Sequence, residues 1–162
     1  YPLARGVSLG FADYALGSDT PRWSGLENYR YMLTDRHFIE SFRVGGIWTV
    51  TVTLGQMLLG LGLALLLNAN LPIQGLARVL VLIPWAMPPV IKGMVWRIFF
   101  HPTAGVFNRI LISLGVIAYP INWLNDYALA LPAAIVVGVW TGLPQTAVTL
   151  LAGLQTIPGE LK

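Results

Sequence analysis

A run of 24 residues without a charge, from position 44 to position 67, limits the fold of this chain more than any other feature. At 1.5 Å per residue, a helix over this run is about 36 Å long, which is enough to cross a hydrocarbon core of about 30 Å. Because lipid offers no hydrogen-bonding partners, a chain that crosses it must satisfy its backbone internally, as a helix does. The run therefore predicts a transmembrane helix over 44–67.

The composition indicates that lipid surrounds much of the chain. Apolar residues make up 56% of the sequence and charged residues 10%, whereas soluble domains carry about 25% charged residues. The net charge of +3 is small and scattered, so it does not indicate nucleic-acid binding. The absence of cysteine excludes disulfides, thiolate nucleophiles and thiolate metal ligands. The predicted fold class is an all-α membrane protein.

Two further apolar segments complete the predicted helix bundle. Residues 79–100 form a candidate span with prolines inside it, and the uncharged stretch Tyr127–Ile157 is longer than one crossing requires, so we predict a span over 127–151. The predicted connecting segments are 1–43, 68–78, 101–126 and 152–162. The sequence begins with Tyr1 and not with Met, and "IPGELK" ends it without a closing element, so we expect the chain to be truncated at both ends.

The polar segment 1–43 contains two predicted helix starts. Ser24 and Glu27, in "SGLE", have the spacing of a capping box, in which each side chain accepts a backbone hydrogen bond from the other residue. Asp35 is a candidate cap for a short helix through Phe42. The segment is therefore expected to contain short helices before the first span.

Helix breakers and a charge interrupt the second candidate span, "LVLIPWAMPPVIKGMVWRIFF". Pro84, Pro88 and Pro89 each lack a backbone donor, so the carbonyl groups they leave free need other partners in lipid. They indicate either a packing kink in a bundle or a broken helix beside a polar pathway. Lys92 would cost about 2.5–3.5 kcal/mol at mid-bilayer; it either snorkels toward the membrane surface or faces a cavity.

Aromatic and polar residues near the spans are candidate substrate contacts. Trp85 and Trp140 lie within or near the predicted spans, and Thr141 and Gln145 add hydrogen-bonding groups. Aromatic faces beside hydroxyl and amide groups suit a polyol, although packing explains the two tryptophans equally well. No catalytic or metal site is predicted, because the two histidines lack ligand spacing and the three apolar runs contain no acid, histidine or cysteine.

Five motifs follow one another along the chain: "WSGLENYRYMLTD", "LGLALLLN", "RVLVLIPWAMPPVIKGMVWRIFFHPTAGVFNRIL", "INWLND" and "AGLQTIPGEL". In this order they resemble the permease subunits of binding-protein-dependent ABC importers, in the maltose-type carbohydrate branch. "IPWAMPP" and "AGLQTIP" are the most specific of these pieces, and the resemblance covers nearly the whole chain. It implies a transmembrane helix bundle of the ABC importer permease type.

The resemblance also implies an orientation and a coupling element. It places residues 4–43 and 101–126 outside the cell and 68–78 and 152–162 in the cytoplasm. The arginine count opposes this orientation, since the positive-inside rule favours the arginine-rich side as cytoplasmic. The last motif would lead into a cytoplasmic loop that docks on an ATPase. The implied lead-in residues are Gly153, Leu154, Gln155, Pro158 and Glu160.

The resemblance further implies the partners of the chain. They are a second homologous permease, two ATPase subunits that use ATP and magnesium, and an extracytoplasmic sugar-binding protein, in the plasma membrane of a bacterium or archaeon. The chain itself would hold no cofactor and catalyse no reaction. The leading hypothesis is a multi-pass permease subunit that forms part of a sugar translocation pathway. The alternatives are a structural or channel-like membrane protein without an ATPase partner, and an intramembrane enzyme, which the absence of acids, histidines and cysteines from the apolar runs opposes.

Overall fold

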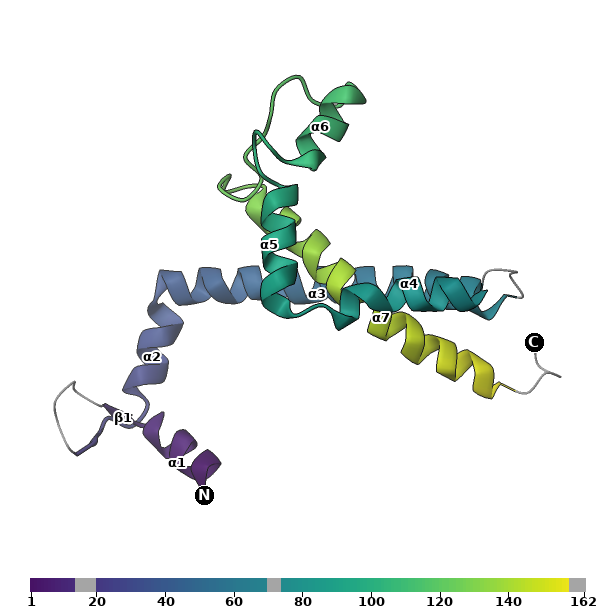
Figure 1. Ribbon diagram of the computed structural model, residues 1–162. Helices are drawn as coiled ribbons and strands as arrows, with labels where there is room; N and C mark the ends of the chain where they lie inside the picture. The colour runs from purple at the N-terminus through teal and green to yellow at the C-terminus, as the bar shows by residue number, and fades with distance from the viewer. Residues whose placement is uncertain (14–19, 70–73, 158–162) are drawn as a thin grey trace. The chain divides into compact units, whose positions relative to one another are not determined.

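The computed structural model describes residues 1–13, 20–69 and 74–157 (Figure 1). It divides into two units, the first covering Tyr1–Ile47 and the second beginning at Trp48. The predicted connections 68–78 and 152–162 lie partly outside the described residues.

Unit 1 combines short helices with a small hairpin. Its elements are α1 (Pro2–Leu9), β1 (Ala12–Asp13), β2 (Arg22–Trp23) and α2 (Glu27–Thr34). The two strands pair antiparallel. The ring of Phe11 packs against two others, with centroid distances of 5.8 Å to Trp23 and 5.3 Å to Tyr29. Because Tyr29 belongs to α2, these ring contacts join the helix to the hairpin.

The predicted capping box at the start of α2 is wrong. The helix begins after Leu26 and has no side-chain cap. The backbone N–H of Ser24 instead donates to the carbonyl oxygen of Phe11 at 2.9 Å, which ties Ser24 to the hairpin. Gly25, with φ of 60°, then turns the chain into the helix, a left-handed conformation that glycine adopts without strain.

The predicted cap at Asp35 is confirmed, but the helix that follows is long. Its carboxylate oxygens accept hydrogen bonds from the N–H groups of His37 and Phe38, both at 3.2 Å. α3 (Arg36–Asn68) then continues without interruption for 33 residues and includes the whole uncharged run. Gly45 and Gly46 follow Phe42, but neither has a positive φ. The helix therefore continues through them and does not end near Phe42 as predicted.

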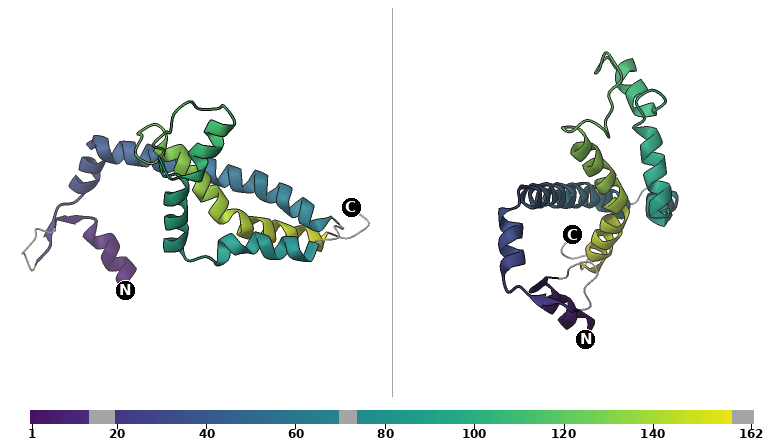
Figure 2. Two further views of the ribbon diagram at one scale, coloured as in Figure 1. Left: turned by 45° about the horizontal axis from the view of Figure 1, so that its top comes forward. Right: turned by 90° about the vertical axis from the view of Figure 1, so that its left-hand side faces the viewer.

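Three helices form the core of unit 2: the later part of α3, α4 (Gln74–Ala86) and α7 (Ala130–Thr156). Ala64 and Leu67 of α3 are buried together with Leu151 of α7, and Ala77 and Val81 of α4 pack against them. α4 and α7 run side by side (Figure 2). Small and branched apolar residues thus hold the three helices together at one end.

Glycines allow α3 and α7 to approach closely where they cross (Figure 1). A Cβ atom at position 60 would lie 2.8 Å from Cγ2 of Thr146. A Cβ atom at position 142 would lie 2.6 Å from Cδ of Gln56. Close helix contact through small residues is the usual basis of helix association in lipid. The absence of side chains at Gly60 and Gly142 therefore allows the two helices to come together at their crossing.

An aromatic cluster and a buried amide organise the segment between α5 (Pro89–Phe99) and α7. The cluster consists of Trp96, Phe99, Phe100, Phe107, Trp123 and Trp140, with centroid distances between 5.0 and 6.5 Å. α6 (Val106–Ser113) contributes Phe107 to it. The cluster thus connects α5, α6 and α7.

Both polar atoms of the Asn108 side chain, Nδ2 and Oδ1, form hydrogen bonds inside this segment. It is 2% exposed, and its Nδ2 donates to the carbonyl oxygens of Pro102 and Ile121, both at 2.9 Å. Its Oδ1 accepts from Nε1 of Trp123 at 2.8 Å and from the N–H of Ile121 at 3.3 Å. One amide thus joins α6 to the chain on either side of it.

Replacing Asn108 should therefore loosen the whole segment. Asn108→Ala leaves the part-buried indole N–H of Trp123 and the part-buried carbonyl groups of Pro102 and Ile121 without their partner. We expect a loss of about 2–4 kcal/mol of stability, since each unsatisfied buried group costs about 1–3 kcal/mol. The apparent melting temperature of the purified protein measures this loss. Asn125→Ala, at an exposed position, is the matched control, and an equal melting temperature for the two variants would contradict the role of Asn108.

Among the residues that the structure describes, two helices, α3 and α7, are long and apolar enough to cross a membrane. The bent pair formed by α4 and α5 would provide a third crossing if it acts as one span. Before α7, Asp126 forms a turn by accepting the N–H groups of Ala128 and Leu129 at 2.9 and 3.1 Å. The mostly helical architecture confirms the predicted class of α-helical membrane protein.

Candidate functional site

One face of α7 is lined with small and polar residues within an otherwise apolar helix. Gly142, Gln145, Thr146 and Thr149 are spaced so that all four lie on the same side. They line a hollow of about 360 Å³ together with residues of α3. Thr146 donates its hydroxyl proton to the carbonyl oxygen of Gly142 at 3.2 Å, whereas the side chains of Gln145 and Thr149 are exposed.

Gln56 brings a second amide to this hollow from α3. Its Nε2 donates to the carbonyl oxygen of Gly138 at 3.0 Å. The amide lies against Gly142, where any side chain would collide with it. The absence of a side chain at Gly142 therefore makes room for Gln56, and the hydrogen bond to the carbonyl oxygen of Gly138 orients this amide at the helix crossing.

A second, smaller hollow continues from the first. It measures about 150 Å³ and is lined by Trp85 and Leu82 of α4 and by Gln145, Val148 and Thr149 of α7. Gln145 and Thr149 line both hollows. Amide, hydroxyl and aromatic groups thus follow one another from Gln56 to Trp85, and we call this set the polar track. Such a combination can bind a ligand that carries both hydroxyl groups and apolar C–H faces.

The structure brings together two of the five predicted substrate contacts, Trp85 and Gln145. Trp140 lies in the aromatic cluster, where its ring is 5.3 Å from that of Trp96. Thr141 lies one helical turn before Gln145 but does not line either hollow. Lys92 is half-buried on α5, and within the described parts of the chain it forms no ion pair.

Sequence reasoning did not select Gln56, Thr146 or Thr149 as site residues. The helical spacing of Gly142, Gln145, Thr146 and Thr149 was available as a signal, because a polar stripe inside an apolar span indicates a face turned away from lipid. The pairing of Gln56 with Gly138 had no such signal. It depends on how two helices far apart in the sequence align.

The prolines divide the second apolar segment into two helices. Pro84 lies inside α4, Pro88 is the N-cap of α5 with ψ of 142°, and Pro89 occupies its first turn. The axes of the two helices differ by 96°. The residue before a proline is disfavoured in helical conformation, and both Met87 and Pro88 precede one. The consecutive prolines therefore account for the break, which lies two residues beyond Trp85.

The predicted lead-in to a coupling loop is only partly described. Gly153, Leu154 and Gln155 lie near the end of α7, whereas Pro158 and Glu160 lie outside the described residues. α7 ends at Thr156, and Ile157 is extended, with ψ of 124°. A following proline favours this conformation.

The comparisons with known proteins agree with the resemblance. No protein-family model matches the chain. The trehalose/maltose transport system permease protein of Thermococcus litoralis is 41% identical over 138 residues, which cover 85% of this chain and 46% of that protein. The sulfoquinovosyl glycerol transport system permease protein of Agrobacterium fabrum is 38% identical over 162 residues, which cover 99% and 52%. The chain belongs to the carbohydrate ABC importer permeases. It spans about half the length of the curated relatives it matches.

Solved structures confirm the fold of this family. A bacterial ABC transporter involved in the import of the acidic polysaccharide alginate matches with a TM-score of 0.81 at 19% identity, covering 99% of this chain and 54% of the other. A bacterial alginate ABC transporter in complex with an alginate pentasaccharide-bound periplasmic protein matches with a TM-score of 0.73 at 19% identity, covering 85% and 48%. The helix arrangement is therefore that of an ABC importer permease.

Proposed function

We propose that this chain forms part of the translocation pathway of an ATP-driven carbohydrate importer. The observation that supports it most is the polar track, in which Gln56, Gln145, Thr149 and Trp85 follow one another between apolar helices. Exposing amide and hydroxyl groups to lipid is unfavourable, so these side chains are expected to face a hydrated path. A sugar passing along it would exchange hydrogen bonds with water for bonds with these groups.

The proposal includes the partners that the family implies. A second permease would cover the exposed apolar faces, two ATPase subunits would bind ATP and magnesium, and an extracytoplasmic sugar-binding protein would deliver the substrate. This chain would bind no cofactor and would carry no catalytic group. It would be a multi-pass protein of a bacterial or archaeal plasma membrane, with Gly153, Leu154 and Gln155 leading toward the ATPase.

The test of the pathway removes single hydroxyl and amide groups. Thr149→Val keeps the shape of the side chain and removes its hydroxyl. We expect sugar uptake to fall about fivefold, which corresponds to one hydrogen bond of about 1 kcal/mol, and Gln145→Leu should reduce uptake further. Uptake of labelled sugar by cells that express the native gene measures both. Thr53→Val, at an exposed position of α3 outside both hollows, is the matched control; equal uptake by the Thr149 and Thr53 variants would refute the pathway.

The orientation is tested by accessibility from outside the cell. We expect a cysteine in place of Ser24 to react with a membrane-impermeant thiol reagent in intact cells, and a cysteine in place of Gln74 to react only after lysis. The reason is that unit 1 is proposed to be extracytoplasmic and the start of α4 cytoplasmic. These 162 residues contain no cysteine, so they contribute no background labelling. The reverse labelling pattern would support the orientation that the arginine count favours.

A further inference from the structure

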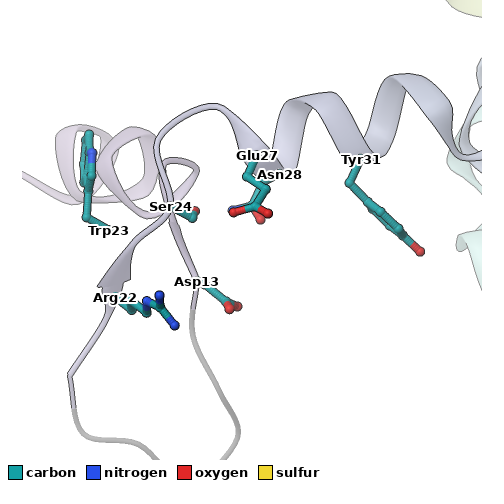
Figure 3. A pocket seen from close by; sticks show the side chains of 7 residues that line it. All are labelled: Asp13, Arg22, Trp23, Ser24, Glu27, Asn28 and Tyr31. Atoms are coloured by element: carbon teal, nitrogen blue, oxygen red, sulfur yellow. The ribbon is translucent and has the colours of Figure 1, made fainter.

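A polar hollow of about 550 Å³ lies in unit 1 (Figure 3). Asp13 and Arg22 reach it from the two strands of the hairpin, Ser24 from the turn that follows, and Glu27 from the start of α2. Figure 3 shows these side chains arranged around one space, with Tyr31 at its side. None of the residues of the polar track takes part in it.

The walls of this hollow are fixed without using its charged groups. Asn28 donates through Nδ2 to the carbonyl oxygens of Ala12 at 3.0 Å and Gly10 at 3.3 Å, which holds α2 against β1. Phe11 stacks on Trp23 with an interplanar angle of 18° and also contacts Tyr29. The backbone bond from Ser24 to Phe11 closes the other side. These contacts keep the lining side chains in place.

The charged groups of the hollow keep their hydrogen-bonding capacity. Asp13 and Arg22 are directly opposite each other in the ladder, where oppositely charged side chains commonly interact. Within the part of the chain that the structure describes, however, neither they nor Glu27 forms an ion pair. The buried hydroxyl oxygen of Ser24 also has no hydrogen-bonding partner there. Buried polar groups normally have partners, so the Ser24 hydroxyl is the group that a ligand would satisfy, and the exposed side chains of the hollow are available to the same ligand.

The chemical groups of the side chains that line the hollow determine which class of ligand can bind there. Carboxylates only accept hydrogen bonds and a guanidinium only donates them, whereas a hydroxyl group does both. A ligand with neighbouring hydroxyl groups can therefore bind Arg22 and the carboxylates at once, while a simple ion would match only one sign. Trp23 and Tyr31 also line the hollow and are 70% and 71% exposed. Phe11 stacks on one face of the Trp23 ring, and a free ring face suits the C–H groups of such a ligand.

We propose that this hollow is a second carbohydrate-binding site, which holds one sugar ring between Arg22, Asp13 and Glu27 outside the apolar helices. The choice of a sugar among polyhydroxylated ligands rests on the proposed function. The site would bind substrate within unit 1 and shares no residue with the polar track.

The experiment measures sugar binding to the purified protein, produced from its native gene, by saturation-transfer NMR with glucose, maltose, trehalose and xylose as probes. All proteins carry Gln145→Leu, which impairs the polar track. We expect at least one sugar to bind, and Arg22→Gln and Glu27→Gln each to raise its dissociation constant about tenfold, as the loss of a charge-assisted hydrogen bond does. Arg22→Lys, which keeps the charge but not the planar fork, should weaken binding less than Arg22→Gln.

Arg30→Gln is the matched control, because Arg30 lies on α2 but does not line the hollow. Binding that is equal in the Arg22→Gln, Glu27→Gln and Arg30→Gln variants would overturn the proposal, and so would the absence of binding of all four sugars. The outcome is independent of the proposed transport function, which is measured as ATP-dependent uptake. Sugar binding at this hollow by a protein that shows no ATP-dependent uptake would refute the proposed function and leave the proposed binding site standing.

Discussion

Gly142→Leu should abolish the tight crossing of α3 and α7. A side chain at position 142 collides with the amide of Gln56, so either the helices separate or Gln56 loses its bond to Gly138. Overpacking costs about 1–3 kcal/mol, and a hydrogen bond between membrane helices is worth about 0.6 kcal/mol and at most about 1.7 kcal/mol. We expect a loss of about 2–4 kcal/mol of stability, together with the loss of sugar uptake, because Gln56 also lines the polar track.

The thermal stability of the purified protein and uptake in cells measure these two effects. The matched control is Gly62→Leu on α3, where the space around the glycine is open to a distance of 4 Å. The same substitution then adds the same apolar volume at a helix position without a close neighbour. If both variants melt at the same temperature, the close approach at Gly142 does not stabilise the protein.

Pro88→Ala/Pro89→Ala should impair transport while leaving the protein inserted in the membrane. The double substitution restores two backbone donors and removes the conformational restriction on Met87 and on position 88. A continuous helix from α4 into α5 then becomes accessible, and the 96° bend beside Trp85 is lost or reduced. Because alternating access requires two arrangements of the helices around the substrate, we expect uptake to fall about tenfold, which corresponds to a bias of about 1.4 kcal/mol between them.

Pro120→Ala, in the exposed segment after α6, is the control for removing a proline elsewhere. Membrane fractionation checks that both variants insert to the same extent. Unchanged uptake by the double variant would show that Pro88 and Pro89 serve only helix packing. This is the packing-kink alternative that the sequence leaves open.

The fold class could be predicted from the sequence because the need to satisfy backbone hydrogen bonds in lipid applies to each membrane-spanning segment separately. A long uncharged run must satisfy its backbone within itself in lipid, and residues 44–67 meet this condition without any knowledge of their neighbours. Local rules were less dependable at the helix ends. Asp35 caps α3 as predicted, whereas Ser24 is held by the hairpin and does not cap α2. A long-range backbone bond took precedence over a local pattern there.

The candidate site could be predicted only in part, because residue type and spacing do not give the alignment between helices. Trp85 and Gln145 were selected by residue type and lie in one hollow. Trp140 was selected on the same ground and lies in the aromatic cluster. The hydrogen bond between Gln56 and Gly138 joins residues 82 positions apart, and no local sequence pattern predicts it. That these residues contact a substrate stays a prediction.

We propose that this chain conducts sugar only when coupled to ATP hydrolysis in partner subunits. The most direct measurement is uptake of labelled sugar into proteoliposomes that contain the protein purified from its native host together with the subunits that bind it. We predict uptake with ATP and magnesium on the cytoplasmic side, none with a non-hydrolysable ATP analogue, and about tenfold less with Gln145→Leu. Sugar entry at the same rate without ATP would contradict the claim and would identify a channel instead.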